Sequence, residues 1–449
     1  MVIVISPKLL EPIEKMLRFL SLIIFSTGVM MSASLPAYKT QTLDNGLQIV
    51  VIPMENNTSV ISTDIFYKVG SRNEVMGKSG IAHMLEHMNF KSTDNLKAGE
   101  FDDVVKSMGG LSNASTGFDY THYFIKSSTK NLSKSLDLFG ELMQSLKLKD
   151  DEFQPERNVV AEERRWRTDN SPLGYMYFRL FNNAYLYHPY HWTPIGFMGD
   201  IQNWTLGDIQ DFHSTFYQPK NAIIVVTGDV NAEDVFTLAK KRFENITNKK
   251  EVPTVHQVEP KQDGAKRLVV NKESEVEMLA MTYHIPNFQH ADQPALSAVS
   301  EMLSAGKSSR LYQGLVNDKR LANQIYAYNM ENIDPGLFIF MAVCNPGVKA
   351  EDVEKEILAE IDKLKTINVD EQELEKVKVN TKADFIYSLE SSSSVGDLFG
   401  GYLARGDLKP LMEYEDKINA LTPADIQAVA VKYFNETQST TVILRKGDQ

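Results

Sequence analysis

The alternation of apolar and polar residues in the first third of the chain predicts strands followed by helices. LDNGLQIVVIP (Leu43–Pro53) and VISTDIFYKVG (Val60–Gly70) alternate with the period of a strand, and Asn45-Gly46 is a typical turn dipeptide. Apolar residues at helical spacing then predict three helices, at Ser79–Phe90, Leu132–Leu146 and Pro155–Arg167. Pro155 suits the first position of a helix, because proline lacks a backbone N–H.

A segment near the middle of the chain is repeated near its end. TLGDIQDFHSTFYQPKNAIIVVTGD begins at Thr205, and TPADIQAVAVKYFNETQSTTVILRKGD begins at Thr422. The matches share one offset of 217 and join Thr205, Asp208, Ile209, Gln210 and Phe216-Tyr217 to Thr422, Asp425, Ile426, Gln427 and Tyr433-Phe434. Both copies run from a helical pattern into an apolar strand. The repeat predicts an α+β fold of two similar halves, each of about 200 residues.

A linker separates the two predicted halves. Residues 248–266 (NKKEVPTVHQVEPKQDGAK) are rich in charge, contain Pro253 and Pro260, and show no apolar period, which is typical of a linker. We therefore expect an N-terminal domain over 38–247 that carries the candidate chemistry. A homologous, non-catalytic C-terminal domain should cover 267–449.

Composition limits the classes of function. The 449 residues carry 47 Lys and Arg against 59 Asp and Glu, a formal net charge of −12, and no Lys/Arg-rich run. Nucleic-acid binding needs a basic surface, so that class is excluded. The one cysteine, Cys344, excludes an intramolecular disulfide and a thiol cluster for metal.

The N-terminus has the pattern of a secretory signal. Two basic residues precede an uncharged run, FLSLIIFSTGVMM (Phe19–Met31), which is short for a membrane span but suits the apolar core of a signal peptide. Residues 1–34 are therefore predicted to be a signal peptide, cut after Ser34 or Ala37, and Met16 is an alternative start. An uncleaved anchor is the alternative interpretation. We expect export to the periplasm and no membrane span in the mature chain.

The segment SGIAHMLEHMNFKST contains an H-x-x-E-H motif. On a helix its apolar residues form one stripe, and His83, Glu86 and His87 lie on the opposite face. Two imidazoles one turn apart can both reach a tetrahedral zinc, and the glutamate between them is placed to hold the metal-bound water. The alternative is a solvated polar face that carries two histidines by chance.

Catalytic zinc usually has three protein ligands, so a third must come from elsewhere in the chain. In QPERNVVAEERRWRTDN, Glu156 and Glu163 lie two helical turns apart and share a face with Val159 and Val160. A carboxylate on an apolar face needs a partner, because burying an unpaired charge is costly. These two glutamates are therefore candidates for metal work, whereas Glu162 should point to the surface. The alternative is a buried salt bridge to a neighbouring arginine, namely Arg157, Arg164 or Arg167.

Together these motifs resemble the pitrilysin/insulinase family of zinc peptidases, over nearly the whole chain after the signal. The resemblance is greatest to the short branch that includes mitochondrial processing peptidase and its bacterial relatives. It implies one zinc per chain, held by His83, His87 and Glu163, with Glu86 as the base and Glu156 supporting the site. It also implies two homologous α/β-roll halves, each a mixed or antiparallel sheet packed with helices, that close like a clamshell around a peptide.

The resemblance implies a zinc metalloendopeptidase that hydrolyses peptides or unfolded polypeptide segments, with Glu86 activating a zinc-bound water. GGLSNA, which contains Asn113 and Ala114, resembles the edge strand with which the family pairs the substrate main chain. A glycine-rich turn that opens an ordinary strand is the alternative. The other histidines considered as ligands are expected to be structural: His122, His188 and His191.

The second half departs from the family pattern. At the repeat offset, the H-x-x-E-H residues become Ser300, Leu303 and Ser304, so a second zinc site is not expected. The family's substrate-gripping Arg and Tyr lack clear matches in LYQGLVNDKRLANQIYAY, where Val316 stands at the arginine position. The residues that could replace them, or else have ordinary helix-face and core roles, are Arg310, Arg320 and Tyr326.

This departure raises the hypothesis of a partner. A homologous, zinc-less chain would supply the missing Arg and Tyr, and a homodimer is the alternative. A peptide-binding or structural subunit without turnover is the alternative function. An intact His-Glu-His-Glu set argues against that alternative, because a scaffold has no use for all four residues.

Overall fold

The computed structural model describes residues 35–54 and 58–447, and the chain from Pro36 onward forms one compact unit. The predicted signal peptide over 1–34 lies outside the described residues, so its cleavage stays a prediction. Among the described residues, none of the helices has the length and apolar character that a membrane span needs.

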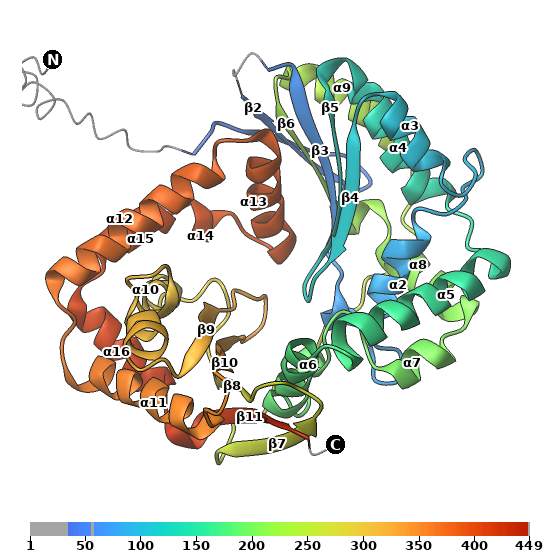
Figure 1. The fold of residues 1–449 in the computed structure, drawn as a ribbon. Helices are drawn as coiled ribbons and strands as arrows, with labels where there is room; N and C mark the ends of the chain where they lie inside the picture. Colours follow the sequence, from blue (N-terminus) through green and yellow to red (C-terminus); the bar gives the residue numbers. More distant parts are fainter. Residues whose placement is uncertain (1–34, 55–57, 448–449) are drawn as a thin grey trace, which may run out of the picture. The chain divides into compact units, whose positions relative to one another are not determined.

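The first half is built on a six-stranded sheet (Figure 1). In spatial order its strands are β1 (Lys39–Thr42), β2 (Gln48–Pro53), β6 (Ala222–Gly228), β3 (Val60–Tyr67), β5 (Thr121–Ser128) and β4 (Leu111–Thr116). Only the β2–β6 pair is parallel, and the other pairs are antiparallel. Every residue of the central strand β6 is buried, whereas β4 is an edge strand with alternating exposure.

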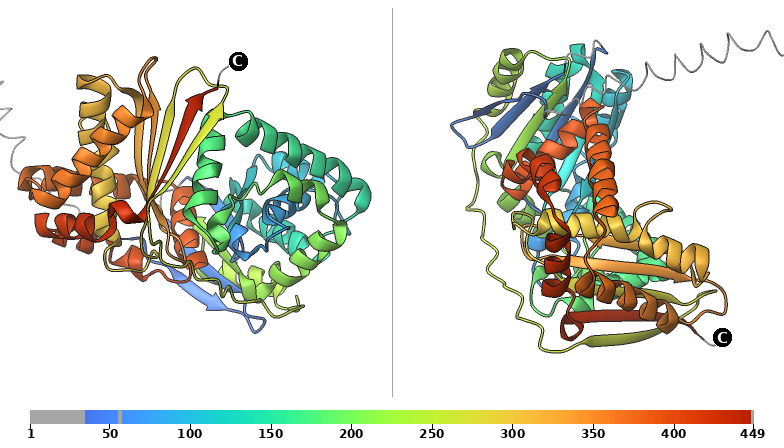
Figure 2. Two further views of the ribbon diagram at one scale, coloured as in Figure 1. Left: turned by 90° about the horizontal axis from the view of Figure 1, so that it is seen from below. Right: turned by 90° about the vertical axis from the view of Figure 1, so that its left-hand side faces the viewer.

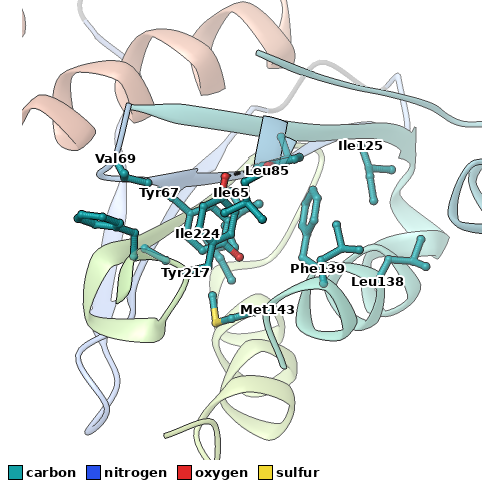
Figure 3. Packing of buried hydrophobic residues seen from close by; sticks show 14 of the residues in the cluster. Ile65, Tyr67, Val69, Leu85, Ile125, Leu138, Phe139, Met143, Tyr217 and Ile224 are labelled. Carbon is teal, nitrogen blue, oxygen red and sulfur yellow. Dashed lines mark hydrogen bonds between the residues drawn. The ribbon is translucent and has the colours of Figure 1, made fainter. Parts of the chain in front are cut away.

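Helices of the first half pack on this sheet and on one another. They are α2 (Ile81–Met88), α3 (Glu100–Ser107), α4 (Leu132–Ser145), α5 (Asp150–Arg164), α6 (Pro172–Ala184), α7 (Met198–Asn203), α8 (Leu206–Phe216) and α9 (Ala232–Phe243). Figure 3 shows part of the core between the sheet and these helices, where Tyr67 of β3 lies beside Tyr217 and Ile224, and Phe139 of α4 belongs to the same cluster. Burial of these side chains, at roughly 25 cal/mol per Å² of apolar surface, holds the helices to the sheet.

The structure confirms most of the predicted elements of the first half. Asn45-Gly46 forms the turn between β1 and β2, and Gly46 has a φ of 89°, which favours glycine. The helix predicted from Pro155 begins earlier, at Asp150, so that prediction was wrong at its start. Pro155 lies inside α5, and acidic residues at 150–152 in the first turn favour the N-terminus of a helix dipole.

The second half repeats the first. Its sheet has the order β7 (Lys266–Lys272), β11 (Ser439–Lys446), β8 (Met278–His284), β10 (Leu337–Cys344) and β9 (Ala322–Asn329). This is the order β2-β6-β3-β5-β4 of the first sheet, again with one parallel pair, β7 with β11. Its helices are α10 (Gln293–Ser304), α11 (Ala350–Thr366), α12 (Glu371–Ser388), α13 (Ser392–Arg405), α14 (Lys409–Met412), α15 (Tyr414–Ala420) and α16 (Pro423–Tyr433).

The repeated sequence segments have the same local structure. Thr205 and Asp208 form a capping box at the start of α8, and Thr422 and Asp425 form the same box at the start of α16. Each helix then leads to the strand that follows it at the centre of its sheet, β6 or β11. The predicted α+β fold of two similar halves is confirmed.

One helix of each half packs on the sheet of the other half. Helix α13 packs on β3 and β6 of the first sheet, and α6 packs on β8 and β11 of the second. Side chains of α6, including Met176 and Phe181, share a core with Leu337 and Val442 of the second sheet. The two halves therefore bury part of their apolar surface against each other.

Residues 244–265 connect the halves without forming a helix or strand. Figure 2 shows this segment as a long, extended yellow-green tube. It is held along its course, since the carboxylate of Glu259 accepts backbone N–H bonds from Leu186, Tyr187 and His188.

Candidate metal centre

A buried carboxylate caps the N-terminus of helix α2. Glu74 accepts hydrogen bonds from the backbone N–H groups of Gly80 and Ala82, at 2.8 Å each, and from the indole of Trp192. Burial raises the pKa of Glu74 to about 8, against the opposing effect of these donors. The helix turns its predicted apolar stripe into the core and leaves His83, Glu86 and His87 half-buried on the other face.

Helix α5 crosses α2 and brings Glu163 to the two histidines. Glu163 Oε2 lies 3.7 Å from His83 Nε2 and 3.3 Å from His87 Nε2. Two ligand atoms on a tetrahedral zinc at ~2.1 Å are about 3.4 Å apart, so these three atoms fit such an ion. Among the described residues, this is the only group of three His, Cys, Asp or Glu side chains that converges closely enough for a metal.

The protonation of the two histidines differs. Burial, together with repulsion from His87, lowers the pKa of His83 to about 4, which leaves its ring neutral. Burial also disfavours a charged His87, but hydrogen bonds to Glu156 and Glu163 outweigh it and raise the pKa of His87 to about 9. Binding of a cation here would therefore release a proton from His87.

A second carboxylate orients His87. Glu156 Oε1 lies 2.8 Å from His87 Nδ1, and its other oxygen lies 2.5 Å from Lys91 Nζ. When His87 has given up one proton, a hydrogen bond from Nδ1–H to Glu156 leaves the lone pair on Nε2, which is the nitrogen that faces Glu163. Glu156 thus touches a candidate ligand and stands outside the cluster itself.

Glu86 lies beside the cluster without joining it. The hydroxyl of Thr116, the last residue of β4, donates to Glu86 Oε2. Burial raises the pKa of Glu86, and this hydrogen bond acts in the opposite direction. A carboxylate with a raised pKa, fixed by one donor, is suited to take up a proton.

Helix α5 also separates the predicted functional and surface residues. Glu162 is exposed, as predicted, and it pairs with Arg165. Glu163 Oε1 lies 3.0 Å from Arg167 Nε, but the Arg167 side chain is 64% exposed. An ion pair therefore exists together with the histidine contacts, although it is not the buried salt bridge weighed as the alternative. Val159 was predicted to lie on an apolar face together with the two glutamates. That prediction was wrong for burial, because the side chain of Val159 is 49% exposed.

The cluster opens into the cavity that also contains the predicted substrate strand. An open space of about 960 Å³ is lined by His83, Glu86, His87 and Glu163, and by residues 113–116 of β4. Asn113 and Ala114 thus lie on an unpaired sheet edge next to the cluster. Their contact with a substrate stays a prediction.

The other candidate histidines are bonded within the protein, away from this cluster. His122 Nε2 lies 2.8 Å from Asp64, and its ring stacks on Phe66. His188 Nε2 lies 2.9 Å from Asp334. His191 Nδ1 lies 2.7 Å from the backbone carbonyl of Tyr185, so all three are structural, as predicted.

The second half has no comparable cluster among its described residues. The hydroxyls of Ser300 and Ser304 donate to the carbonyl of Ala327 in β9, and Leu303 is buried. Arg310 forms two hydrogen bonds with Glu373. Arg320 and Tyr326 are exposed, and Val316 packs against the second core.

Two residues of the site escaped the sequence prediction. Lys91 follows α2 and pairs with Glu156, and Thr116 bonds Glu86. Strand alternation places Thr116 on the same face as Ala114, which is a signal that points to it. Lys91 has no such signal, because its partner comes from a distant helix.

Comparison with known proteins finds relatives that align over most of this chain. Residues 49–182 match the family model "Insulinase (Peptidase family M16)", and residues 203–380 match "Peptidase M16 inactive domain". The chain is 57% identical to the zinc protease PqqE of Helicobacter pylori, over 96% of this chain and 99% of that protein. It is 26% identical to the probable mitochondrial-processing peptidase subunit beta of Arabidopsis thaliana, over 95% of this chain and 82% of that one.

A solved structure agrees with these matches. The crystal structure of a protease from Helicobacter pylori superimposes with a TM-score of 0.90 at 59% identity, and covers 92% of this chain and 100% of that chain. The similarity runs through both halves of the repeat. The chain therefore belongs to the insulinase family of peptidases, peptidase family M16.

Proposed function

We propose that this protein is a zinc-dependent endopeptidase that cleaves peptides or unfolded polypeptide segments, with Glu86 as its general base. The observation that carries the proposal is the convergence of His83, His87 and Glu163 beside Glu86, in a cavity bordered by the open edge of β4. An open edge can pair with the main chain of an extended peptide, which recognises the backbone of many sequences.

The residues of the site have separate tasks in this reaction. His83, His87 and Glu163 would hold zinc, which when bound acidifies water and polarises a carbonyl group. Glu86 takes the proton of the attacking water and gives it to the leaving amine. Thr116 holds the Glu86 carboxylate in place through its hydrogen bond. Strand β4 positions the peptide so that its scissile carbonyl lies over the cluster.

The first prediction tests the base. Glu86→Gln removes the proton acceptor and keeps the three candidate ligands. We therefore expect kcat to fall by about 10²–10⁴-fold, while the zinc content stays that of the wild type. Peptide cleavage and metal analysis on the same preparation measure both quantities. Substantial activity in this variant would contradict the assignment. Binding of peptide by a wild-type chain that never cleaves would favour a non-catalytic subunit.

The second prediction tests the third ligand. Glu163→Gln removes the one carboxylate that faces both histidines, so zinc should be lost together with activity. Glu162→Gln, one residue away and exposed, is the matched control and should keep both. Unchanged zinc occupancy in Glu163→Gln would refute the ligand set.

We further propose that the active species contains a homologous, zinc-less partner chain. In support, Val316 stands where the family has an arginine and packs against the second core, and Arg310 is bonded to Glu373. Of the two arginines considered as replacements, Arg320 alone is exposed. Native mass spectrometry of the protein from its own source reads metal and partner together. Full activity of a lone chain or of a homodimer would refute this part of the proposal.

Export is also proposed, on the strength of the N-terminal signal pattern alone. N-terminal sequencing of the mature protein should begin after Ser34 or Ala37. A mature chain that retains Phe19–Met31 would favour the anchor instead.

A further inference from the structure

Helix α5 and the turn after it carry two exposed apolar side chains beside the metal cluster. Trp166 is 72% exposed, whereas the other two tryptophans, Trp192 and Trp204, are 4% and 2% exposed. Val159 is 49% exposed. The indole of Trp166 makes no hydrogen bond and no ring contact with any described residue. Leaving a tryptophan bare to water forgoes the free energy of burying a large apolar surface.

Both side chains share a helix face with the candidate ligand Glu163. Positions 159, 163 and 166 are separated by four and three residues, the spacing of neighbours along one helix face. All three line the cavity that contains β4. The same face therefore presents a carboxylate to the metal cluster and apolar surface on either side of it.

The backbone that carries Trp166 is held in place. The helix continues past α5 as a π-turn over Arg165–Asp169, and Gly174 of α6 packs directly against the carbonyl of Arg167. A side chain at position 174 would collide with that carbonyl. Trp166 thus lies on a supported segment, which favours a fixed surface.

The charges next to these two side chains already have partners. Arg165 pairs with Glu162, and Arg167 pairs with Glu163. Glu162 and Arg167 are exposed and line the same cavity. Val159 and Trp166 are therefore apolar positions between charged side chains.

We infer that Val159 and Trp166 form an apolar shelf that binds a bulky apolar side chain of the substrate next to the scissile bond. The inference rests on the proposed function. A peptide paired with β4 projects successive side chains to opposite sides, and those on the side of α5 meet the shelf. The substrate class is then polypeptide segments with Leu, Phe or a similar residue beside the cleaved bond.

The first test is kinetic. The probes are fluorogenic peptides that differ at one position beside the cleaved bond, with Gly, Ala, Leu or Phe. Trp166→Ala should lower kcat/KM by about tenfold for the Leu and Phe peptides, mainly through KM, and change it little for the Gly peptide. Trp166→Phe should retain the preference. Tyr387→Ala removes another exposed aromatic side chain, 63% exposed and outside the cavity, and should behave as the wild type.

The second test measures binding without turnover. In Glu86→Gln, the Leu or Phe peptide should shift tryptophan emission to shorter wavelength, because Trp166 is the exposed tryptophan of the three. The shift should be absent with Trp166→Phe in the same background. It should also be absent with the Gly peptide.

The outcomes separate the shelf from the proposed function. An equal loss for all peptides in Trp166→Ala, or no loss, would overturn the shelf. An emission shift that persists in Trp166→Phe would overturn it too. A wild-type chain that cleaves none of the peptides would overturn the proposed function, and the emission shift would still decide whether the shelf binds apolar side chains.

Discussion

At the residue scale, the ring of His87 is held from both of its nitrogens. Nε2 faces Glu163, and Nδ1 faces Glu156, whose other oxygen pairs with Lys91. Burial opposes ionisation of Glu156, but its bonds to His87 and Lys91 outweigh burial and lower its pKa. Glu156 is therefore a charged group that fixes the tautomer and the direction of a candidate ligand.

This arrangement predicts a metal affinity that depends on a residue outside the ligand set. Glu156→Gln should weaken zinc binding by about 10–100-fold, because His87 loses its charged acceptor. Lys91→Met should weaken it in the same direction. Titration against a chelating dye measures the affinity, with Glu162→Gln as the control. Equal affinity in Glu156→Gln and Glu162→Gln would show that Glu156 does not orient the ligand.

Much of the metal cluster could be predicted from residues alone, since H-x-x-E-H spacing on a helix places two imidazoles on one face. Glu163 followed from its spacing and the family resemblance. The exposure of Val159 could not be predicted, because an apolar residue is expected to be buried, and its true exposure depends on which residues pack against it in the folded chain. The 72% exposure of Trp166 could not be predicted for the same reason.

At the scale of elements, α8 packs against the metal-bearing helix α2. The same helix carries His213, which is 5% exposed and stacks on Tyr217. Burial lowers the pKa of His213 from 6.5 to about 3. The ring is therefore neutral in the folded protein over the range in which it becomes charged in the unfolded chain.

The sign of this pKa shift predicts acid destabilisation. Between pH 6.5 and about 3, the unfolded chain binds a proton at His213 that the folded chain does not bind. The stability gained by burying a neutral His213 is present in full above pH 6.5. As the pH falls below that value, the free energy of unfolding decreases by up to about 1.4 kcal/mol per pH unit. His213→Phe should flatten the pH dependence of the free energy of unfolding. Urea denaturation at several pH values measures it.

A surface histidine provides the control for this prediction. His290 has a side chain that is 39% exposed, so His290→Gln should leave the slope near that of the wild type. A slope in His213→Phe as steep as in the wild type would mean that His213 does not cause the acid sensitivity.

At the scale of the whole molecule, the two halves are joined by the exchange of α6 and α13. The contact of α13 with the first sheet depends on glycine. A Cβ at Gly400 would overlap the ring of Phe66 in β3, and one at Gly396 would lie 2.8 Å from Asp64 Oδ2. The close approach of a helix from one half to a strand of the other therefore requires the absence of side chains.

This contact predicts a stability effect far from the metal cluster. Gly400→Ala should lower the free energy of unfolding, because overpacking costs about 1–3 kcal/mol and the better helix propensity of alanine returns only about 1 kcal/mol. Gly199→Ala, where an added Cβ meets nothing within 4 Å, should be neutral or stabilising. Urea denaturation compares the two, and equal stability would show that α13 can shift without cost.

The sequence by itself determined the repeat, the α+β class and most of the metal cluster, because these depend on local periodicity and on spacing within single helices. Only the tertiary structure decided which helix covers which sheet, that Lys91 and Thr116 support the site, and that Trp166 is exposed. Those features arise from contacts between segments distant in the chain. Local patterns of apolar and polar residues do not specify which distant segment of the chain a side chain will contact.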